Sequence, residues 1–309
     1  MKQKKSAYLI TKPLQYINAT NIPDDNNKDC FIVDYFKDSK IFYENISENS
    51  SYWDEIYYLR KRRNFYIFIL KNKRKYKDIY MDSDQSFLAF IFSLIVLPIK
   101  IYTYEEGYGS YRELRDETKL IEKIKINIYK LLGSNNWLGG GTFTKGMFLY
   151  HPESFNNLVP KNKKKIYPFR KNFIDHANLL MKELGSLFDS KILDIIKNRD
   201  VILYLSSWEI NVEVFSIIEQ YPGYFTIIKP HPNIKNDIKL DNFDYILNSI
   251  LPAELYIHQI LIRCKNLIIV HENSSSLIYV GNIKCTEINL KVADHSFIIY
   301  NKIRELLSS

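Results

Sequence analysis

Residues 201–232 read VILYLSSWEINVEVFSIIEQYPGYFTIIKPHP, and this stretch decides the fold class. Val201–Ser206 and Phe225–Lys229 are short apolar runs rich in β-branched and aromatic residues, as buried parallel strands are. Ile210–Tyr221 lies between them and has the apolar spacing of an amphipathic helix. A strand, a helix and a second strand in this order predict a crossover between parallel strands of one sheet.

The same alternation recurs along the whole chain. Further strands are predicted at Ala7–Thr11, Phe31–Tyr35, Asp54–Tyr58, Asp78–Met81, Lys100–Tyr104, Tyr245–Leu247, Leu267–Val270 and Cys285–Leu290. Further helices are predicted at Pro13–Asn21, 109–135, Pro252–Cys264, Ser274–Val280 and Ser296–Leu307. Phe87–Ile99 is the most apolar stretch; it is shorter than the ~20 residues that cross a bilayer, so we expect a buried helix. The predicted fold class is α/β.

Two domains are predicted, because 309 residues exceed the roughly 100–200 residues of one domain. Residues 151–173 contain three prolines and a lysine run without a clear period, which places the boundary there. The predicted domains are residues 1–155 and 156–309, both Rossmann-like, with parallel sheets that face each other across a cleft. Such folds bind ligands at the carboxyl ends of their strands. The last helix is a candidate to pack back on the N-terminal domain.

The chain has a net charge of +8, which favours anionic partners such as nucleic acid, phosphorylated ligands or an anionic membrane face. Basic runs occur at Arg60–Arg63, Lys71–Lys77 and Lys161–Lys165. No nucleic-acid-binding fingerprint accompanies them, so nucleic acid is not an expected partner. The three cysteines form no CxxC pair, and no signal-peptide pattern opens the sequence. We therefore expect a cytoplasmic protein.

An acidic pair follows the strand Lys100–Tyr104, where Glu105 and Glu106 precede Gly107. Successive side chains at the end of a strand point to opposite sides, so one of the two carboxylates is expected to face the cleft. A carboxylate beside a like charge and a tyrosine has a raised pKa, which suits a general base. The structural alternative is a solvated turn in which Gly107 has a positive φ.

Three further polar groups follow predicted strands or open predicted helices of the second half. His231 stands between two prolines after Phe225–Lys229, where it can donate to a phosphate. Ser274–Ser276 offers successive hydroxyls before a helix, as an anion site does. Glu254, in the first turn of the helix after Pro252, answers the helix dipole or accepts the hydroxyls of a ribose. Together these groups predict a nucleotide phosphate site.

The order of these motifs resembles that of the bacterial sialyltransferases, which share an acidic-acidic-Gly, a His-Pro and a Ser-Ser motif. Glu105-Glu106-Gly107, His231-Pro232 and Ser275-Ser276 match the three in order. The Pro-x-Glu helix start of some of these enzymes is matched by Pro252 and Glu254. The stretch Thr11–Gln15 (TKPLQ) and the pattern Glu-Glu-Gly-x-Gly-x-Tyr are most similar to the lipooligosaccharide sialyltransferase group, glycosyltransferase family 52.

The resemblance implies a GT-B fold and an inverting transfer of sialic acid, or a related nonulosonic acid, from a CMP-activated donor. The acceptor would be a glycan hydroxyl of lipooligosaccharide, capsule or a lipid-linked oligosaccharide, and no metal or other cofactor would take part. The implied partners are the CMP-sugar and a glycan or glycolipid acceptor. The basic charge would hold such an enzyme on the anionic inner face of the membrane. A homodimer is left open.

The resemblance also implies roles for individual residues. Glu105 would deprotonate the acceptor hydroxyl, and His231 would stabilise the departing phosphate. In the lipooligosaccharide group an acidic residue upstream of the histidine has the base role, and Glu209, 22 residues before His231, is the second candidate base. The nucleotide-binding set is Lys229, Pro232, Glu254, Ser274, Ser275 and Ser276. The residues for the donor and acceptor sugars are Gln15, Glu106, Gly107 and Tyr108.

Two alternative functions remain open. Asp82-Ser83-Asp84 is an Asp-x-Asp sequence, which in another glycosyltransferase fold holds a divalent metal and a nucleotide-diphosphate sugar. Its structural interpretation is that Ser83 or Asp84 caps the helix that follows. The second alternative is a non-enzymatic protein whose basic runs bind nucleic acid or an anionic membrane.

Overall fold

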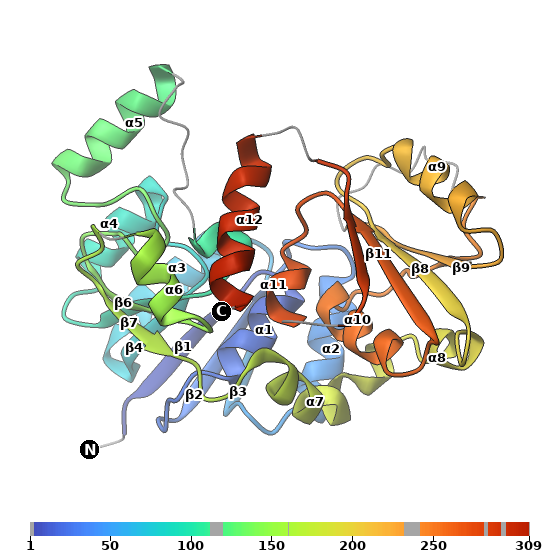
Figure 1. The fold of residues 1–309 in the computed structure, drawn as a ribbon. Helices are drawn as coiled ribbons and strands as arrows, with labels where there is room; N and C mark the ends of the chain where they lie inside the picture. The colour runs from blue at the N-terminus through green and yellow to red at the C-terminus, as the bar shows by residue number, and fades with distance from the viewer. Residues whose placement is uncertain are drawn as a thin grey trace. The chain divides into compact units, whose positions relative to one another are not determined.

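The computed structural model describes residues 3–111, 120–159, 161–231, 242–280, 284–291 and 295–308. They form two compact units, Met1–Glu183 and Leu184–Ser309. Each unit has its own parallel sheet (Figure 1).

The first unit contains a seven-stranded sheet in the order β3-β2-β1-β4-β5-β6-β7, with every neighbouring pair parallel. Its strands are β1 (Lys5–Ile10), β2 (Lys28–Val33), β3 (Glu55–Leu59), β4 (Tyr76–Met81), β5 (Lys100–Tyr104), β6 (Thr144–Leu149) and β7 (Lys165–Pro168). Its helices are α1 (Pro13–Thr20), α2 (Ser39–Asn49), α3 (Arg62–Lys71), α4 (Phe87–Ile95), α5 (Leu120–Leu131), α6 (Pro152–Leu158) and α7 (Phe173–Leu184), with short 3-10 turns at Lys73–Lys75 (η1) and Tyr108–Tyr111 (η2).

The second unit contains a five-stranded sheet in the order β10-β9-β8-β11-β12, again parallel throughout. Its strands are β8 (Asp200–Leu205), β9 (Phe225–Lys229), β10 (Tyr245–Ile246), β11 (Asn266–His271) and β12 (Thr286–Asn289). Its helices are α8 (Lys191–Ile195), α9 (Glu213–Gln220), α10 (Ala253–Leu261), α11 (Ser276–Val280) and α12 (His295–Ser308), and a 3-10 turn occupies Gly185–Leu187 (η3). The two parallel sheets confirm the predicted α/β class.

Successive side chains of a strand point to opposite faces of the sheet. Because the strands of the first sheet are apolar on both faces, helices cover both of them. Ala7 and Leu9 of β1 pack in one core cluster with the apolar sides of α3 and α4. Tyr8 lies between them in sequence and stacks on Tyr80 of β4, with 4.4 Å between ring centroids. Tyr8 also meets the ring of Trp53 edge-on. The tyrosines at these positions therefore belong to the core.

The structure overturns part of the expected organisation around residues 151–173. A strand of the first sheet, β7, lies in this stretch and pairs with β6 from Gly146↔Lys165 to Leu149↔Pro168. The first unit thus extends to Glu183, beyond the boundary expected after residue 155. Strand β7 is an edge strand with a lysine and a proline, and such edges have the composition of a linker.

Two helix predictions also need correction. Phe87–Ile99 was predicted as a buried helix; α4 ends at Ile95, and its Phe87 and Leu88 are 62% and 61% exposed. The helix predicted over 109–135 is η2 followed by α5, and residues 112–119 lie outside the described part of the chain. Within the described residues, no helix is both long and apolar enough to cross a membrane.

Candidate functional site

The strand order of the second sheet reverses direction between β8 and β11, which are neighbours although β9 and β10 separate them in sequence. In open α/β sheets, ligands bind outside the carboxyl ends of the strands at such a switch point. The residues that follow β8, β9 and β11 are therefore the first place to look for a ligand site in this unit.

His231 follows β9 and is tied to the end of β8. Its backbone N–H donates to the hydroxyl of Ser206 at 2.9 Å. Its ring stacks on the indole of Trp208, with 5.5 Å between centroids and 18° between planes. The indole is 65% exposed, so it forms an open flat surface beside the imidazole. Sequence reasoning selected His231 but missed Trp208, whose only signal is an aromatic residue just after a buried strand.

Glu272 joins the ends of β8 and β11. Its Oε1 accepts from the Ser207 hydroxyl at 3.0 Å and from the Tyr204 hydroxyl at 3.2 Å. Its side chain is 8% exposed, and Nζ of Lys291, beyond β12, lies 3.8 Å from Oε2. Burial and the charge of Glu272 raise the pKa of the Tyr204 phenol, so this phenol stays a hydrogen-bond donor at neutral pH. The sequence places Glu272 beside the serines but does not show that it braces two strands.

The serine cluster follows Glu272 through a residue in the left-handed region, Asn273, with φ of 55°. The backbone N–H of Ser274 donates to Nδ1 of His271 at 3.2 Å, and the hydroxyl of Ser274 accepts from the N–H of Ser276 at 3.3 Å. Ser274 and Ser275 are partly exposed, whereas Ser276 is buried at the start of α11. Solvent therefore reaches Ser274 and Ser275, whereas Ser276 is enclosed.

Lys229 and Glu254 form a second charged group in this unit. The Lys229 ammonium donates to the carbonyl of Ser249. Burial lowers the pKa of Lys229 to about 8, against the attraction of Glu254. Glu254 is 3% exposed in the first turn of α10. Burial raises the pKa of its carboxyl, whereas its own backbone N–H, the Ser276 hydroxyl and the Lys229 charge act in the opposite direction. The structure thus groups Lys229, Glu254 and Ser276.

Glu209 and Pro232 are the two remaining predicted residues of this unit. Glu209 is exposed, and its backbone carbonyl accepts from the Ser207 hydroxyl at 3.2 Å. Its carboxylate is thus on the surface directly after Trp208. Pro232 lies outside the described residues.

In the first unit, Glu105 is fully buried after β5. Its Oε2 accepts from the Tyr111 hydroxyl at 2.7 Å and from the backbone N–H of Tyr150 at 2.8 Å. Its backbone carbonyl accepts from Nδ2 of Asn18 in α1 at 2.8 Å. Burial, and next the charge of Glu105, raise the pKa of Tyr111 well above the ordinary value, so Tyr111 remains a donor. Glu105 is therefore held in one orientation.

Glu106 has the opposite environment, which confirms that the adjacent carboxylates point to different sides. Its side chain is 30% exposed and is paired with the ammonium of Lys12. Gly107 has φ of 90°, a value that glycine adopts without strain. Tyr108 then opens η2 with its ring largely buried. Of the four residues predicted to contact the sugars, Glu106 is the charged one that solvent reaches.

Gln15 is fully buried in a polar network at the carboxyl ends of β1 and β4, where the first sheet also changes direction. Its Oε1 accepts from the backbone N–H of Thr11 at 2.6 Å, and its Nε2 donates to Asp82 at 3.3 Å. Asp82 also accepts from the Thr11 hydroxyl at 2.8 Å and pairs with the guanidinium of Arg62. In this structure Gln15 braces the ends of two strands.

The two carboxylates of the Asp-x-Asp sequence take part in two separate hydrogen-bond networks. Asp84 accepts from the backbone N–H groups of Gly139 and Gly141 at 3.1 and 2.8 Å, and from the Thr144 hydroxyl at 2.6 Å. Asp82 faces Arg62 and Thr11 instead. Neither Ser83 nor Asp84 caps α4 as predicted; the N-cap is Ser86, which accepts from the N–H of Ala89. Among the described residues, no three acidic, histidine or cysteine side chains are grouped to hold a metal.

Solved structures similar to this chain share its architecture. HepE from Anabaena, in complex with UDP-glucose, matches with a TM-score of 0.55 at 10% identity over 98% of this chain and 92% of that chain. The glycosyltransferase SnogD from Streptomyces nogalater matches with a TM-score of 0.45 at 10% identity over 100% and 95%. The likeness to HepE shows that this chain has the GT-B fold. No protein-family model and no curated protein matches the sequence.

Proposed function

We propose that this chain is an inverting glycosyltransferase that transfers sialic acid, or a related nonulosonic acid, from a CMP-activated donor to a glycan hydroxyl. The observation that carries the proposal is the group at the switch point of the second sheet, where His231 stacks on Trp208 and Ser207 donates to Glu272, the residue that precedes the serine cluster by two positions. HepE, which has the same fold, was solved with a nucleotide sugar. The choice of CMP rests on the sialyltransferase-like motifs.

The donor contacts follow from charge and exposure. A CMP-sugar has one phosphate, and its bond to the sugar breaks in the transfer, so negative charge grows on the departing phosphate. The His231 imidazole and the Ser275 hydroxyl are donors that solvent reaches, and groups of this kind stabilise such charge. Glu254 would accept the ribose hydroxyls, and Lys229 beside it would supply positive charge. The exposed indole of Trp208 offers a flat surface for a base or a sugar ring.

The acceptor hydroxyl must lose its proton as its oxygen attacks the anomeric carbon from the side opposite the phosphate. We assign Glu105 as the general base that takes this proton, with Glu209 as the second candidate. Tyr111 and the Tyr150 N–H fix the Glu105 carboxylate, which pre-organises it for proton transfer. Because Glu105 is buried, the acceptor has to displace the groups that cover it, whereas Glu209 is reachable as it stands. The two assignments are therefore distinguishable by mutation.

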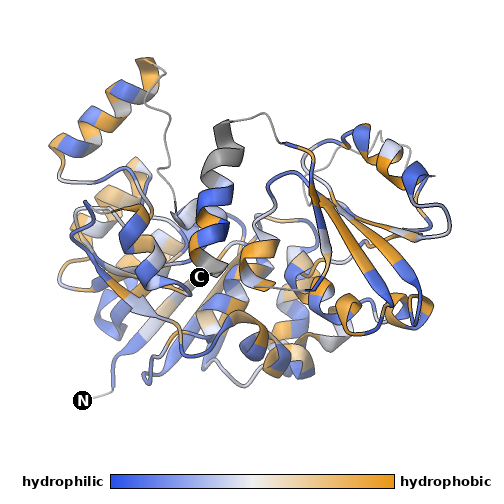
Figure 2. Cartoon of the chain, in the orientation of Figure 1, coloured by the Kyte–Doolittle hydropathy of each residue, from blue (hydrophilic) through white to orange (hydrophobic). Residues whose placement is uncertain are grey.

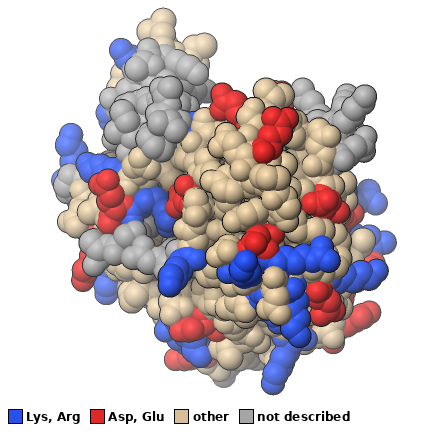
Figure 3. All heavy atoms as spheres, turned by 45° about the vertical axis from the view of Figure 1, so that its right-hand side comes forward, with Lys and Arg blue, Asp and Glu red and all other residues tan. Residues whose placement is uncertain are grey.

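No metal takes part in the proposed transfer, and activity is expected to survive EDTA. Asp82 and Asp84, the residues of the metal-dependent alternative, already serve as acceptors for a guanidinium and for backbone N–H groups. The non-enzymatic alternative relies on basic runs. On the face seen in Figure 3, Lys and Arg side chains are interspersed with Asp and Glu side chains.

A donor screen tests the proposal. Thermal unfolding is measured with CMP, UDP and GDP, and nucleotide release is measured with the corresponding sugar nucleotides and a glycan acceptor. CMP at a hundredfold excess over its dissociation constant should stabilise the fold by about 2.7 kcal/mol, with no comparable effect of UDP or GDP. Equal stabilisation by UDP would remove the CMP assignment but keep the transferase. Absence of any nucleotide effect would remove both.

A further inference from the structure

Two helices of the first unit present large apolar side chains to solvent. Of the eighteen large hydrophobic residues that are exposed in the described part of the chain, ten lie on or beside α4 and α5. They are Phe87, Leu88, Leu94, Ile95, Leu97, Leu120, Ile121, Ile124, Ile128 and Leu131. Exposed apolar side chains gathered in this number on two helices indicate an interaction site rather than chance exposure.

Helix α5 is amphipathic along its whole length. Ile124 and Ile128 are 52% and 51% exposed and lie one turn apart, and Leu131 at the end of the helix is 87% exposed. Its sequence LIEKIKINIYKL contains three lysines and one glutamate, so basic residues accompany the apolar stripe. Figure 2 shows the alternating apolar and polar bands on this helix, which extends away from the sheet.

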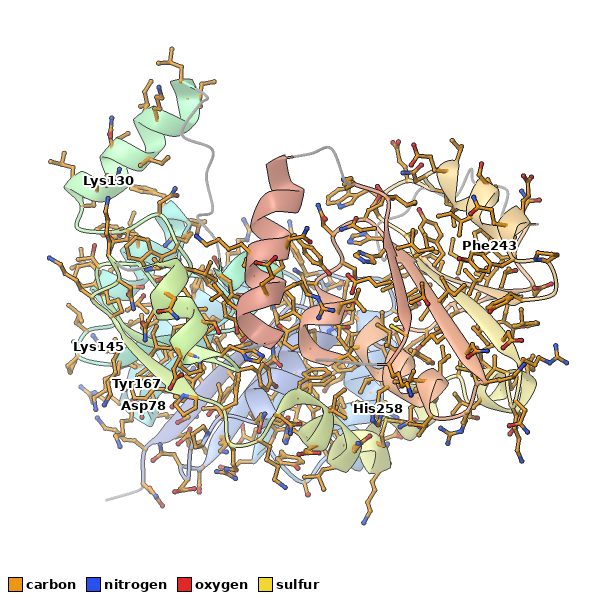
Figure 4. All side chains as sticks on the ribbon, in the orientation of Figure 1. Asp78, Lys130, Lys145, Tyr167, Phe243 and His258 are labelled. Atoms are coloured by element: carbon orange, nitrogen blue, oxygen red, sulfur yellow. The ribbon has the colours of Figure 1, made fainter. Side chains whose placement is uncertain are left out.

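The connection from α5 to β6 is fixed beside α4, which brings the two apolar helices to the same side of the unit (Figure 1). Nε2 of Gln85, just before α4, donates to the carbonyl of Trp137 at 2.7 Å. The ring of Phe90 in α4 packs against Phe143, with 5.5 Å between centroids. Lys130, labelled in Figure 4, lies at the end of α5 nearest this connection, and Lys145 follows on β6; both are exposed.

We propose that the surface formed by α4 and α5 binds an anionic lipid bilayer, with the exposed side chains of α5 inserted at the level of the headgroups. An amphipathic helix that has apolar residues on one side and lysines beside them lies in the membrane interface in this way. Lysines near the surface attract anionic lipids, and a protein with a net charge of +8 adds to that attraction. A protein partner of ordinary composition would not need the lysines beside the stripe.

Vesicle co-sedimentation tests this proposal. The full chain is mixed with vesicles of equal parts phosphatidylglycerol and phosphatidylcholine, or of phosphatidylcholine alone. The variant Ile124→Asp/Ile128→Asp is compared with a matched control, Ile41→Asp/Ile262→Asp, whose isoleucines are 54% and 60% exposed on α2 and at the end of α10. Both variants change the net charge equally. Circular dichroism verifies that each is folded.

The wild-type chain should sediment with the anionic vesicles and much less with the neutral ones. The α5 variant should bind the anionic vesicles at least about tenfold more weakly than the control variant. Equal loss in both variants would mean that charge alone drives binding, and this overturns the assignment to α5. Equal binding of the wild type to both vesicle types overturns it too. It is likewise overturned if sedimentation shows that the wild-type chain is a dimer and the α5 variant a monomer. No sugar donor is present, so the outcome is independent of the proposed transferase activity.

Discussion

The indole of Trp208 lies nearly parallel to the imidazole of His231, with 5.5 Å between the two ring centroids. Trp208 follows β8 and His231 follows β9, so the stack joins the carboxyl ends of neighbouring strands. The Ser206 hydroxyl fixes the backbone of His231 at the same place. The imidazole is therefore oriented before any ligand arrives.

Trp208→Ala should weaken donor binding and turnover by roughly three- to tenfold, because an aromatic pair contributes about 0.5–1.5 kcal/mol beyond burial. Trp208→Phe keeps a ring and should recover most of the loss. His231→Ala should cost more, about a hundredfold or greater in turnover, because it removes a donor to the departing phosphate. Steady-state kinetics with a CMP-sugar measures both. If His231→Ala were as active as Trp208→Phe, the histidine would be a structural residue.

Glu105→Gln should lower turnover by about 10²–10⁴ if this carboxylate takes the proton. It should also lower the melting temperature, because the amide places an N–H₂ group where a buried carboxylate oxygen now accepts two hydrogen bonds. Glu106→Gln is the matched control for stability: it alters the neighbouring, partly exposed carboxylate and should leave the melting temperature nearly unchanged.

A different outcome would assign the role of general base to Glu209 in the second unit. It is a Glu105→Gln protein that melts earlier but turns over normally, together with a Glu209→Gln protein that is folded and inactive. Glu105 would then be a structural residue that connects β5, α1 and η2.

Ser275→Ala should raise the donor Michaelis constant about ten- to a hundredfold without unfolding the protein, since a hydrogen bond to a charged group contributes about 1.5–3 kcal/mol. Ser276→Ala should behave differently. Its hydroxyl interacts with buried Glu254, so its loss should lower stability as well as affinity. Thermal unfolding without ligand separates the two variants; identical behaviour in both assays would show that the serines form a single cap.

Donor affinity should fall as the pH rises through about 8, because the pKa of Lys229 is lowered to about 8 by burial. The lysine has its positive charge below this value and loses it above, and the donor phosphate favours the charged form. Lys229→Arg keeps the charge at higher pH and should remove the decline. Titration calorimetry with CMP at several pH values measures it. An unchanged profile in Lys229→Arg would assign the decline to another group.

Stability should fall as the pH drops from about 6.5 toward 4, and His176 should account for part of the fall. Burial, with Lys171 and Arg170 nearby, lowers the pKa of His176 to about 4. In this window the unfolded chain takes up the proton and the folded chain does not, so protonation favours unfolding by up to about 3 kcal/mol.

Urea unfolding of the wild type and of His176→Gln at about pH 7 and about pH 5 measures this contribution as a difference between the two proteins. The variant should lose the interaction with Thr20, whose hydroxyl lies 2.8 Å from Nε2, at both pH values. It should also show a smaller change between them. A parallel pH dependence in both proteins would contradict the assignment.

The fold was predictable from the sequence where a strand forms a continuous apolar run. Every strand predicted from an apolar run exists. A short run of consecutive apolar residues such as Val201–Ser206 is typical of a parallel strand that is buried on both faces. Strands β6 and β7 were missed for a physical reason. Strand β6 includes Gly146, where a Cβ atom would lie 2.4 Å from the carbonyl oxygen of Lys165. Strand β7 is a basic edge strand. Neither resembles a buried strand in composition.

The candidate site was predictable only in part. His231, Ser275 and Glu254 stand at strand ends and helix starts that periodicity locates, so a single sequence identifies them. The partnership of Trp208 with His231, and that of Glu272 with Tyr204, join strands that are distant in sequence. Burial is equally invisible from sequence: Glu105 and Glu106 are identical neighbours, yet one is enclosed and the other meets solvent.

The hydrogen bonds of Asp84 to the loop before β6 restrict which residues can replace the glycines of this loop. A Cβ added at Gly141 would lie 2.6 Å from Oδ2 of Asp84, and one added at Gly139 would lie 2.7 Å from the Thr103 hydroxyl. Gly109 has no atom within 4 Å of such a Cβ. The backbone N–H groups of both glycines donate to Asp84, and a larger residue at 141 would displace this carboxylate, whereas a Cβ at position 109 would meet no atom.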